Sequence, residues 1–141
     1  MNAIIGCLLF IVLAFLSGLH FYWGIGGKWG ISASVPSNEQ HKRVLNPGPV
    51  ACFAVGFALL AMGVFILAEA RIIIIALPDL LDDFGLCVIA AIFLLRAVGE
   101  FNYIGFFKRI KGTNFADADT RYFSPLCILI SLLVSLLEIN K

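Results

Sequence analysis

Four long apolar stretches, separated by shorter polar ones, dominate the chain. The stretches cover residues 3–23, 50–67, 84–107 and 123–139. A bilayer core about 30 Å thick needs roughly 20 mostly apolar residues per helix, and each stretch is close to that length. The pattern predicts an all-α fold in which one domain, residues 1–141, forms an integral membrane four-helix bundle.

Helix-breaking residues indicate how the stretches are joined. Asn-Pro-Gly-Pro at residues 46–49 ends a polar loop and restarts a helix. Pro125 falls in the first turn of the fourth stretch, where a missing N–H costs least. Residues 68–83 have an apolar core too short to cross, so they either extend the second span to about residue 77 or lie along the membrane interface. We favour the extension, ended by a turn at Pro78.

Composition supports a membrane location. Hydrophobic residues make up 61% of the chain and charged residues 13%, which is outside the range of soluble domains. The net charge of +1 gives no indication of nucleic-acid binding. The cysteines stand singly in apolar runs, without a C-x-x-C motif or a histidine at metal-ligand spacing, and we interpret them as small buried hydrophobes. They are Cys7, Cys52, Cys87 and Cys127. We therefore expect no metal and no cofactor.

The basic residues are unevenly distributed between the two sides of the predicted bundle. The loops after the first and third spans share one side and carry Lys28, Lys42, Arg43, Lys108, Arg109, Lys111 and Arg121. The other side carries Arg71 and Lys141. Because cytoplasmic loops are enriched in Lys and Arg, we expect a multi-pass protein of the inner (plasma) membrane with extracytoplasmic N- and C-termini.

Three ionisable residues of the first and third predicted spans fall in the cytoplasmic half of the membrane. Counting about 1.5 Å per residue from Phe84 puts Arg96 roughly 18 Å and Glu100 roughly 24 Å below the outer boundary. The same count from Ala3 puts His20 at roughly 25 Å, level with Glu100. Arg96 and Glu100 are four residues apart on one predicted helix face and are expected to pair. The pair either orients the bundle or belongs to a functional site.

These residues and their neighbours form the candidate ligand-binding set, on the cytoplasmic side. It comprises His20, Tyr22, Trp23, Arg96, Glu100, Tyr103, Asp119 and Arg121. Asp117 and Asp119 have the D-x-D spacing that begins a calcium loop, but the required Gly and Glu do not follow. Elsewhere, Cys52, Gly56 and Gly63 place small side chains along one side of the second span, as close helix packing requires.

Two segments carry a pattern of mixed polar and aromatic residues that resembles a known family. They are "HFYWGIGGKWG", residues 20–30, and "RAVGEFNYIGFFKRIKGTNFADADTRYFSPLC", residues 96–127. The chain resembles domain-of-unknown-function family 3995, a group of small four-helix bacterial integral membrane proteins. Glu100 stands where that pattern has Asp at least as often. The resemblance implies fold and location and supplies no reaction.

Three functions remain open at this stage. The polar set binds a small amphipathic or anionic molecule, with His20 or Glu100 as an acid or base if the protein is an enzyme. Alternatively, it belongs to a small carrier that couples protons through Glu100. In the third reading, the protein is a non-catalytic structural or accessory subunit that docks a protein partner. The lipid bilayer is the expected environment in every case, and self-association is compatible with all three.

Overall fold

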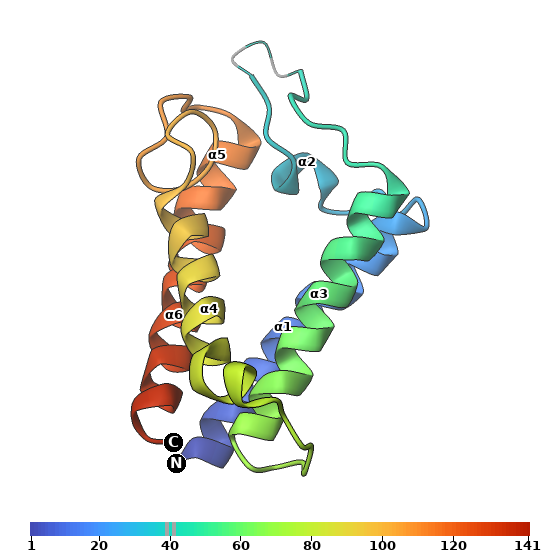
Figure 1. Cartoon of the computed structure of the whole chain (residues 1–141). Helices are drawn as coiled ribbons and strands as arrows, with labels where there is room; N and C mark the ends of the chain where they lie inside the picture. Colours follow the sequence, from blue (N-terminus) through green and yellow to red (C-terminus); the bar gives the residue numbers. More distant parts are fainter. Residues whose placement is uncertain (39, 41) are drawn as a thin grey trace.

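The computed structural model describes residues 1–38, 40 and 42–141, and the described chain is helical (Figure 1). An isolated bridge between Ser37 and Arg43 is the only β-type pairing in these residues. The helical elements in chain order are α1 (Asn2–Gly24), α2 (Ile31–Ser34), α3 (Pro49–Glu69), α4 (Asp79–Val98), α5 (Asn114–Ala118), a π-helical turn η1 (Asp119–Phe123) and α6 (Ser124–Ile139). The last three elements form one continuous helical segment.

In the described part of the chain, three helical segments are long and apolar enough to cross a membrane. They are Asn2–Gly24, Pro49–Glu69 and Asn114–Ile139. The first two lie close to the predicted first and second helices, whereas the third begins before the predicted start at residue 123. Helix α4 has 20 residues, but its first turn carries Asp79 and Asp82 and its last turn carries Arg96. Its charges therefore separate it from the three more apolar segments.

Helices α1 and α3 form one antiparallel hairpin, held together by close contact at small residues. A Cβ atom added at Gly56 would lie 2.5 Å from the ring of Phe21. The hydroxyl of Ser17 donates a 2.7 Å hydrogen bond to the Gly56 carbonyl. Cys52, Gly56 and Gly63 are all buried on α3, which confirms the predicted packing stripe. Small side chains allow the two backbones to approach closely enough for these contacts.

Helices α4 and α6 form the second hairpin, in which Ser131 donates a 2.8 Å hydrogen bond to the Ala90 carbonyl. One buried cluster joins both hairpins, with Leu13 and Ile66 from the first and Phe93 and Val134 from the second. In Figure 1 the hairpins converge at the end that holds both termini and diverge towards the loops. At the convergent end the Asn2 side chain donates a 2.7 Å hydrogen bond to the Asn140 carbonyl.

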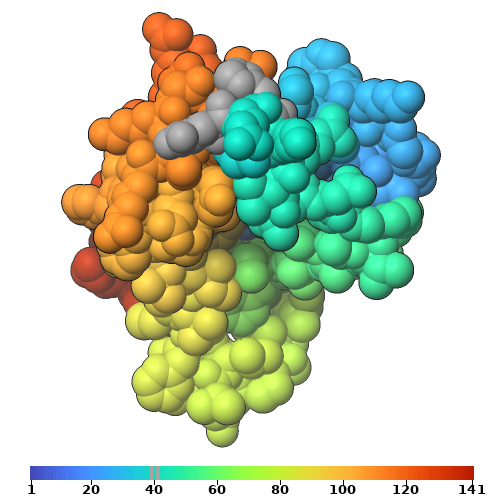
Figure 2. All heavy atoms as spheres, turned by 90° about the horizontal axis from the view of Figure 1, so that it is seen from above, coloured from blue at the N-terminus to red at the C-terminus, as the bar shows by residue number. Residues whose placement is uncertain are grey.

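The loop end is formed by two segments that are far apart in the sequence. Viewed from this end, the blue-to-cyan segment after α1 lies beside the orange segment around α5 (Figure 2), and α2 packs against α5. Asn114, at the start of α5, shares a small pocket with Ser32 and Val35 from around α2. The long helices of the two hairpins therefore meet at the end that holds the termini, and the connecting segments around α2 and α5 meet at the loop end.

The predicted third span, residues 84–107, is wrong at both ends. Helix α4 begins earlier, at Asp79, after Pro78 as its N-cap, and it ends at Val98. Gly99 follows with φ +81°, a conformation that stops a helix and favours glycine. Residues 99–113 then form an irregular loop rather than a continued helix.

The favoured extension of the second span to residue 77 is also wrong, because α3 ends at Glu69. Arg71 adopts φ +57°, outside the right-handed helical region. The following run, Ile72–Ile75, consists of β-branched residues, which lose side-chain freedom in a helix. Pro78 also disfavours a helical conformation at the residue before it. A left-handed residue and a poor helix-forming run together explain why the apolar segment is not helical.

Candidate functional site

The loop of residues 99–113 folds back on the end of α4 through two glycines. Gly99 and Gly105 both have positive φ, and a Cβ at Gly105 would lie 2.6 Å from the Gly99 Cα. The amide of Phe106 donates a 2.9 Å hydrogen bond to the Ala97 carbonyl. Ile110 closes the loop by donating from its amide to the Asn102 carbonyl, also at 2.9 Å. The crossing of the two glycines places Gly105 and Lys108 against η1.

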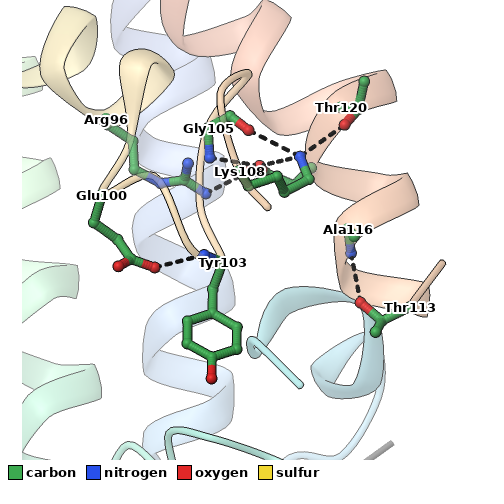
Figure 3. Close-up of polar contacts among 9 residues, drawn as sticks. Arg96, Glu100, Tyr103, Gly105, Lys108, Thr113, Ala116 and Thr120 are labelled. Carbon is green, nitrogen blue, oxygen red and sulfur yellow. Dashed lines mark hydrogen bonds and ion pairs between the residues drawn. The ribbon is translucent and has the colours of Figure 1, made fainter. Parts of the chain in front are cut away.

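A buried carboxylate at the start of η1, Asp119, holds this loop in place, and Figure 3 labels its partners Arg96, Gly105 and Lys108. The Asp119 side chain is 0% exposed. Its Oδ1 accepts a hydrogen bond from Arg96 Nη2 at 2.9 Å. Its Oδ2 accepts from the Gly105 amide at 2.8 Å and from Lys108 Nζ at 2.9 Å. Asp119 thus joins α4, the loop and the α5–η1–α6 segment, and we call Arg96, Lys108 and Asp119 the charge cluster.

Lys108 is as deeply buried as its partner, with a side chain 2% exposed. Besides Asp119, its ammonium group donates to the Gly105 carbonyl at 2.9 Å and to Thr120 Oγ1 at 2.7 Å. An ammonium group has three N–H donors, so all of them are used. Burying a charged pair requires this degree of hydrogen bonding to offset the loss of hydration. The charge cluster therefore stabilises the loop by attaching it to α4 and η1.

A pocket of about 640 Å³ lies on the outer side of Lys108, and we call it the basic groove. It is lined by Phe106, Lys108, Lys111, Ala116, Asp117, Thr120 and Arg121. Lys111 and Arg121 are exposed, and so is the opposing carboxylate, Asp117. None of the ion pairs found in the described part of the chain involves these three residues. The groove therefore presents two cations and one anion that the described side chains leave without a charged partner.

Five of the eight predicted site residues, including Glu100, lie in or beside this region. Arg96 and Asp119 are brought together, and Arg121 lines the basic groove with its guanidinium 5.9 Å from the ring centre of Tyr122. Tyr103 lies in the loop, where its amide donates to Glu100. Lys108, which the sequence indicates only as a basic residue of the loop after the third span, is buried, and Thr120 is not among the predicted site residues. Only the loop crossing brings these two residues together.

The predicted pairing of Arg96 with Glu100 is wrong. Glu100 is exposed, and its Oε1 accepts a 2.6 Å hydrogen bond from the Tyr103 amide within the loop. The pairing required a helix that continued for a further turn, whereas α4 ends at Val98. Arg96 instead binds Asp119, 23 residues further along the chain. Glu100 is consequently not a carboxylate within a helix, as the carrier hypothesis required.

His20, Tyr22 and Trp23 form a separate group at the end of α1. The His20 ring lies 2.8 Å from the Leu16 carbonyl through Nδ1 and packs edge-on against Trp23, with the ring centres 5.1 Å apart. Trp23 Nε1 donates a 2.9 Å hydrogen bond to the Trp29 carbonyl, and the Tyr22 hydroxyl accepts a longer one from the Trp29 amide. These contacts tie the turn after α1 to its last helical residues, so the group has a local structural role.

A second polar cluster lies at the opposite end of the molecule, where the termini meet. Lys141 Nζ lies 2.9 Å from Oε2 of Glu69, whose side chain is 1% exposed, and also lies near Asp82 and Glu138. Burial favours the neutral amine, but the hydrogen bond to Glu69 and the three nearby carboxylates raise the pKa of Lys141 above its usual value. This contact links the end of α6 to the end of α3 and so joins the two hairpins.

The described residues contain no group of three or more His, Cys, Asp or Glu side chains arranged to hold a metal ion. Asp119, one of the two acids with D-x-D spacing, already accepts hydrogen bonds from two cationic side chains. The four cysteines are free, with Cys52 and Cys127 buried and Cys7 and Cys87 exposed on their helices. The burial expected for the cysteines is therefore confirmed for Cys52 and Cys127 and wrong for Cys7 and Cys87.

The described residues form a helical fold with three helices long and apolar enough to cross a membrane, as is typical of a membrane protein. Residues 13–134 of the 141 match the family described as "Protein of unknown function (DUF3995)". The chain belongs to this family, which confirms the resemblance found in its sequence. No curated protein and no solved structure matches the chain.

Proposed function

We propose that the protein is a multi-pass membrane protein of the inner (plasma) membrane that crosses the bilayer four times. Helix α4 packs along α6, which lies within a segment apolar enough to span, and its 20 residues correspond to about 30 Å. The acids of its first turn then lie at one membrane boundary, and Arg96 is paired with Asp119 near the other. An even number of crossings agrees with two termini at one end of the molecule.

This topology is testable with single cysteines and a membrane-impermeant thiol reagent. With the termini outside, Asn2→Cys and Asn140→Cys are expected to react in intact cells, whereas Asn46→Cys is expected to react only after permeabilisation. The parent protein, whose four cysteines all lie within helices, gives the background. Reaction at only one of the two terminal positions would mean an odd number of crossings, and reaction at Asn46 alone would reverse the orientation.

The proposed activity is binding of a small amphipathic anion in the basic groove. The observation that carries it is the pair of exposed cations, Lys111 and Arg121, beside a buried and saturated Lys108. The charge cluster fixes the loop of residues 99–113 against η1, and so sets the backbone positions from which the groove residues project. Preorganisation of this kind lowers the cost of binding. Exposed Phe106 supplies an apolar wall for the non-polar part of a ligand.

The binding proposal predicts selective stabilisation by amphipathic anions. Octyl phosphate, octanoate and octyl sulfonate should raise the melting temperature of the purified protein in a neutral detergent, and octyl glucoside should not. A ligand at about 100 times its Kd stabilises the folded state by about 2.7 kcal/mol, which is readily measured. Arg121→Glu should abolish the shift, while Arg43→Glu, in the other loop, should retain it. Equal responses in the two variants would contradict a site in the groove.

The accessory-subunit alternative gives a different outcome in the same variants. It is supported by the saturation of Asp119, which leaves the charge cluster with a structural role. If no amphipathic anion stabilises the protein, but a stoichiometric partner is lost from membranes that contain Arg121→Glu and retained with Arg43→Glu, the groove is a docking surface for a protein.

A further inference from the structure

The basic groove lies close to the level at which the α5–η1–α6 segment becomes apolar. Arg121 is the last basic residue before the apolar residues of this segment. Tyr122 follows it, is 60% exposed and carries the Arg121 guanidinium over its ring. Tyrosine side chains are enriched at the membrane–water interface, where the headgroups lie. In a membrane-spanning arrangement, the groove therefore opens at headgroup depth.

The donors of the groove are suited to a tetrahedral oxyanion. Thr120 Oγ1 accepts the hydrogen bond from Lys108, so its own proton remains available to donate into the groove. The planar guanidinium of Arg121 has donors in a fork that matches two phosphate oxygens. The ammonium group of Lys111 adds a third source of donors. Three donor groups of different kinds thus line one pocket.

The charge balance of the groove favours a dianion. Asp119 pairs with both Arg96 and Lys108, so the charge cluster keeps a net charge of +1. The exposed lining charges, Lys111, Arg121 and Asp117, add a further +1. A phosphomonoester carries a charge of about −1.5 to −2 at pH 7 and has three terminal oxygens. A carboxylate carries a single charge and two oxygens. A phosphomonoester therefore uses both exposed cations and the hydroxyl group more fully.

We propose that the basic groove binds the phosphate of an anionic membrane lipid, with a phosphomonoester headgroup preferred. This inference rests on the proposed anion site and names its ligand. The phosphate contacts Arg121, Lys111 and the Thr120 hydroxyl, and the glycerol end of the lipid lies against Phe106. Lys108 touches no ligand atom, because its donors are used within the protein, and it contributes only its position and field.

The test measures binding of four probes to the full-length protein in a neutral detergent by native mass spectrometry. The probes are dioctanoyl phosphatidic acid, dioctanoyl phosphatidylglycerol, dioctanoyl phosphatidylcholine and inorganic phosphate. Phosphatidic acid should bind at least several-fold more tightly than the other lipids. Inorganic phosphate should bind more weakly than phosphatidic acid, because it lacks the glycerol and acyl parts.

A matched control, Arg43→Gln, separates a specific site from general attraction to surface charge. Arg121→Gln should weaken phosphatidic acid binding roughly tenfold or more, since it removes a charged bidentate contact. Thr120→Val should weaken it by a smaller factor, and Asp117→Asn should strengthen it by removing the only free anion of the lining. Arg43→Gln removes an equal charge from the other loop and should leave binding unchanged. Melting of each variant without ligand verifies that it is folded.

Each outcome has a definite meaning. Equal binding of both anionic lipids, with equal losses in Arg121→Gln and Arg43→Gln, would overturn the lipid site in favour of non-specific attraction. Inorganic phosphate binding as tightly as phosphatidic acid would identify a soluble phosphate as the ligand and overturn a lipid source. If octyl sulfonate or octanoate stabilises the protein and no phosphate compound binds, the lipid inference fails and the anion site stands. If no anion of either panel binds, both fail.

Discussion

Asp119→Asn is expected to lower the free energy of unfolding by about 3–5 kcal/mol, the usual cost of removing one partner from a buried ion pair. The amide keeps the size of the side chain but removes its negative charge. Lys108, 2% exposed, and Arg96 then face each other without a carboxylate between them. The Gly105 amide also loses its charged acceptor. Denaturant unfolding of the purified protein in mixed micelles measures the change.

Asp117→Asn is the matched control for this prediction. It makes the same chemical change two residues earlier, at an exposed carboxylate, and should alter stability by no more than about 0.5 kcal/mol. In Asp119→Asn, limited proteolysis should cut the loop of residues 99–113 faster than in the parent, because the loop has lost its attachment to η1. Similar stabilities for the two variants would show that the charge cluster does not hold the loop.

A double-mutant cycle with Lys108 tests the physical cause. Lys108→Met leaves Asp119 with the Arg96 and Gly105 donors, so we expect it to cost less than Asp119→Asn. Once Lys108 is neutral, replacing Asp119 no longer leaves a buried ammonium group unpaired. The double variant should therefore be more stable than the sum of the single effects predicts, by about 1–3 kcal/mol. Additive effects would mean that the two side chains act independently.

Gly105→Ala should be the second most damaging change, with a loss of about 3 kcal/mol or more from backbone strain and overpacking together. The residue has φ +87°, and its added Cβ would meet the Val98 carbonyl and lie 2.6 Å from the Gly99 Cα. These neighbours are backbone atoms, which cannot rotate away as a side chain can. The same denaturant unfolding experiment measures the loss.

Gly112→Ala separates the cost of backbone strain from the cost of overpacking. Gly112 also has positive φ, at +77°, but no atom lies within 4 Å of the position that its Cβ would occupy. Its replacement should cost only the strain of the left-handed conformation, about 1–2 kcal/mol. Anion-dependent stabilisation should survive in Gly112→Ala and be lost in Gly105→Ala, because displacing the loop moves Phe106 and Lys108. Equal losses in both variants would argue against a tight crossing of Gly99 and Gly105.

The predicted pairing of Arg96 with Glu100 failed because the sequence pattern does not show where the helix ends. A spacing of four residues places Arg96 and Glu100 on one face only while the helix continues, and nothing in the apolar pattern indicates that it ends between them. The end is produced by Gly99, whose positive φ is stabilised by the approach of Gly105 from further along the chain. A helical pattern thus predicts local neighbours correctly only where no tertiary contact competes.

The sequence alone determined three of the apolar helices, the small-residue packing face of α3 and the family, because these depend on the composition and spacing of neighbouring residues. Only the tertiary structure decided which charges meet. The partners of Asp119 lie 23 residues away in α4 and 11 residues away in the loop, and the geometry that joins them exists only after the chain has turned back at its two glycines. Local periodicity carries no information about such contacts, since their energy comes from burial that is created by the fold itself.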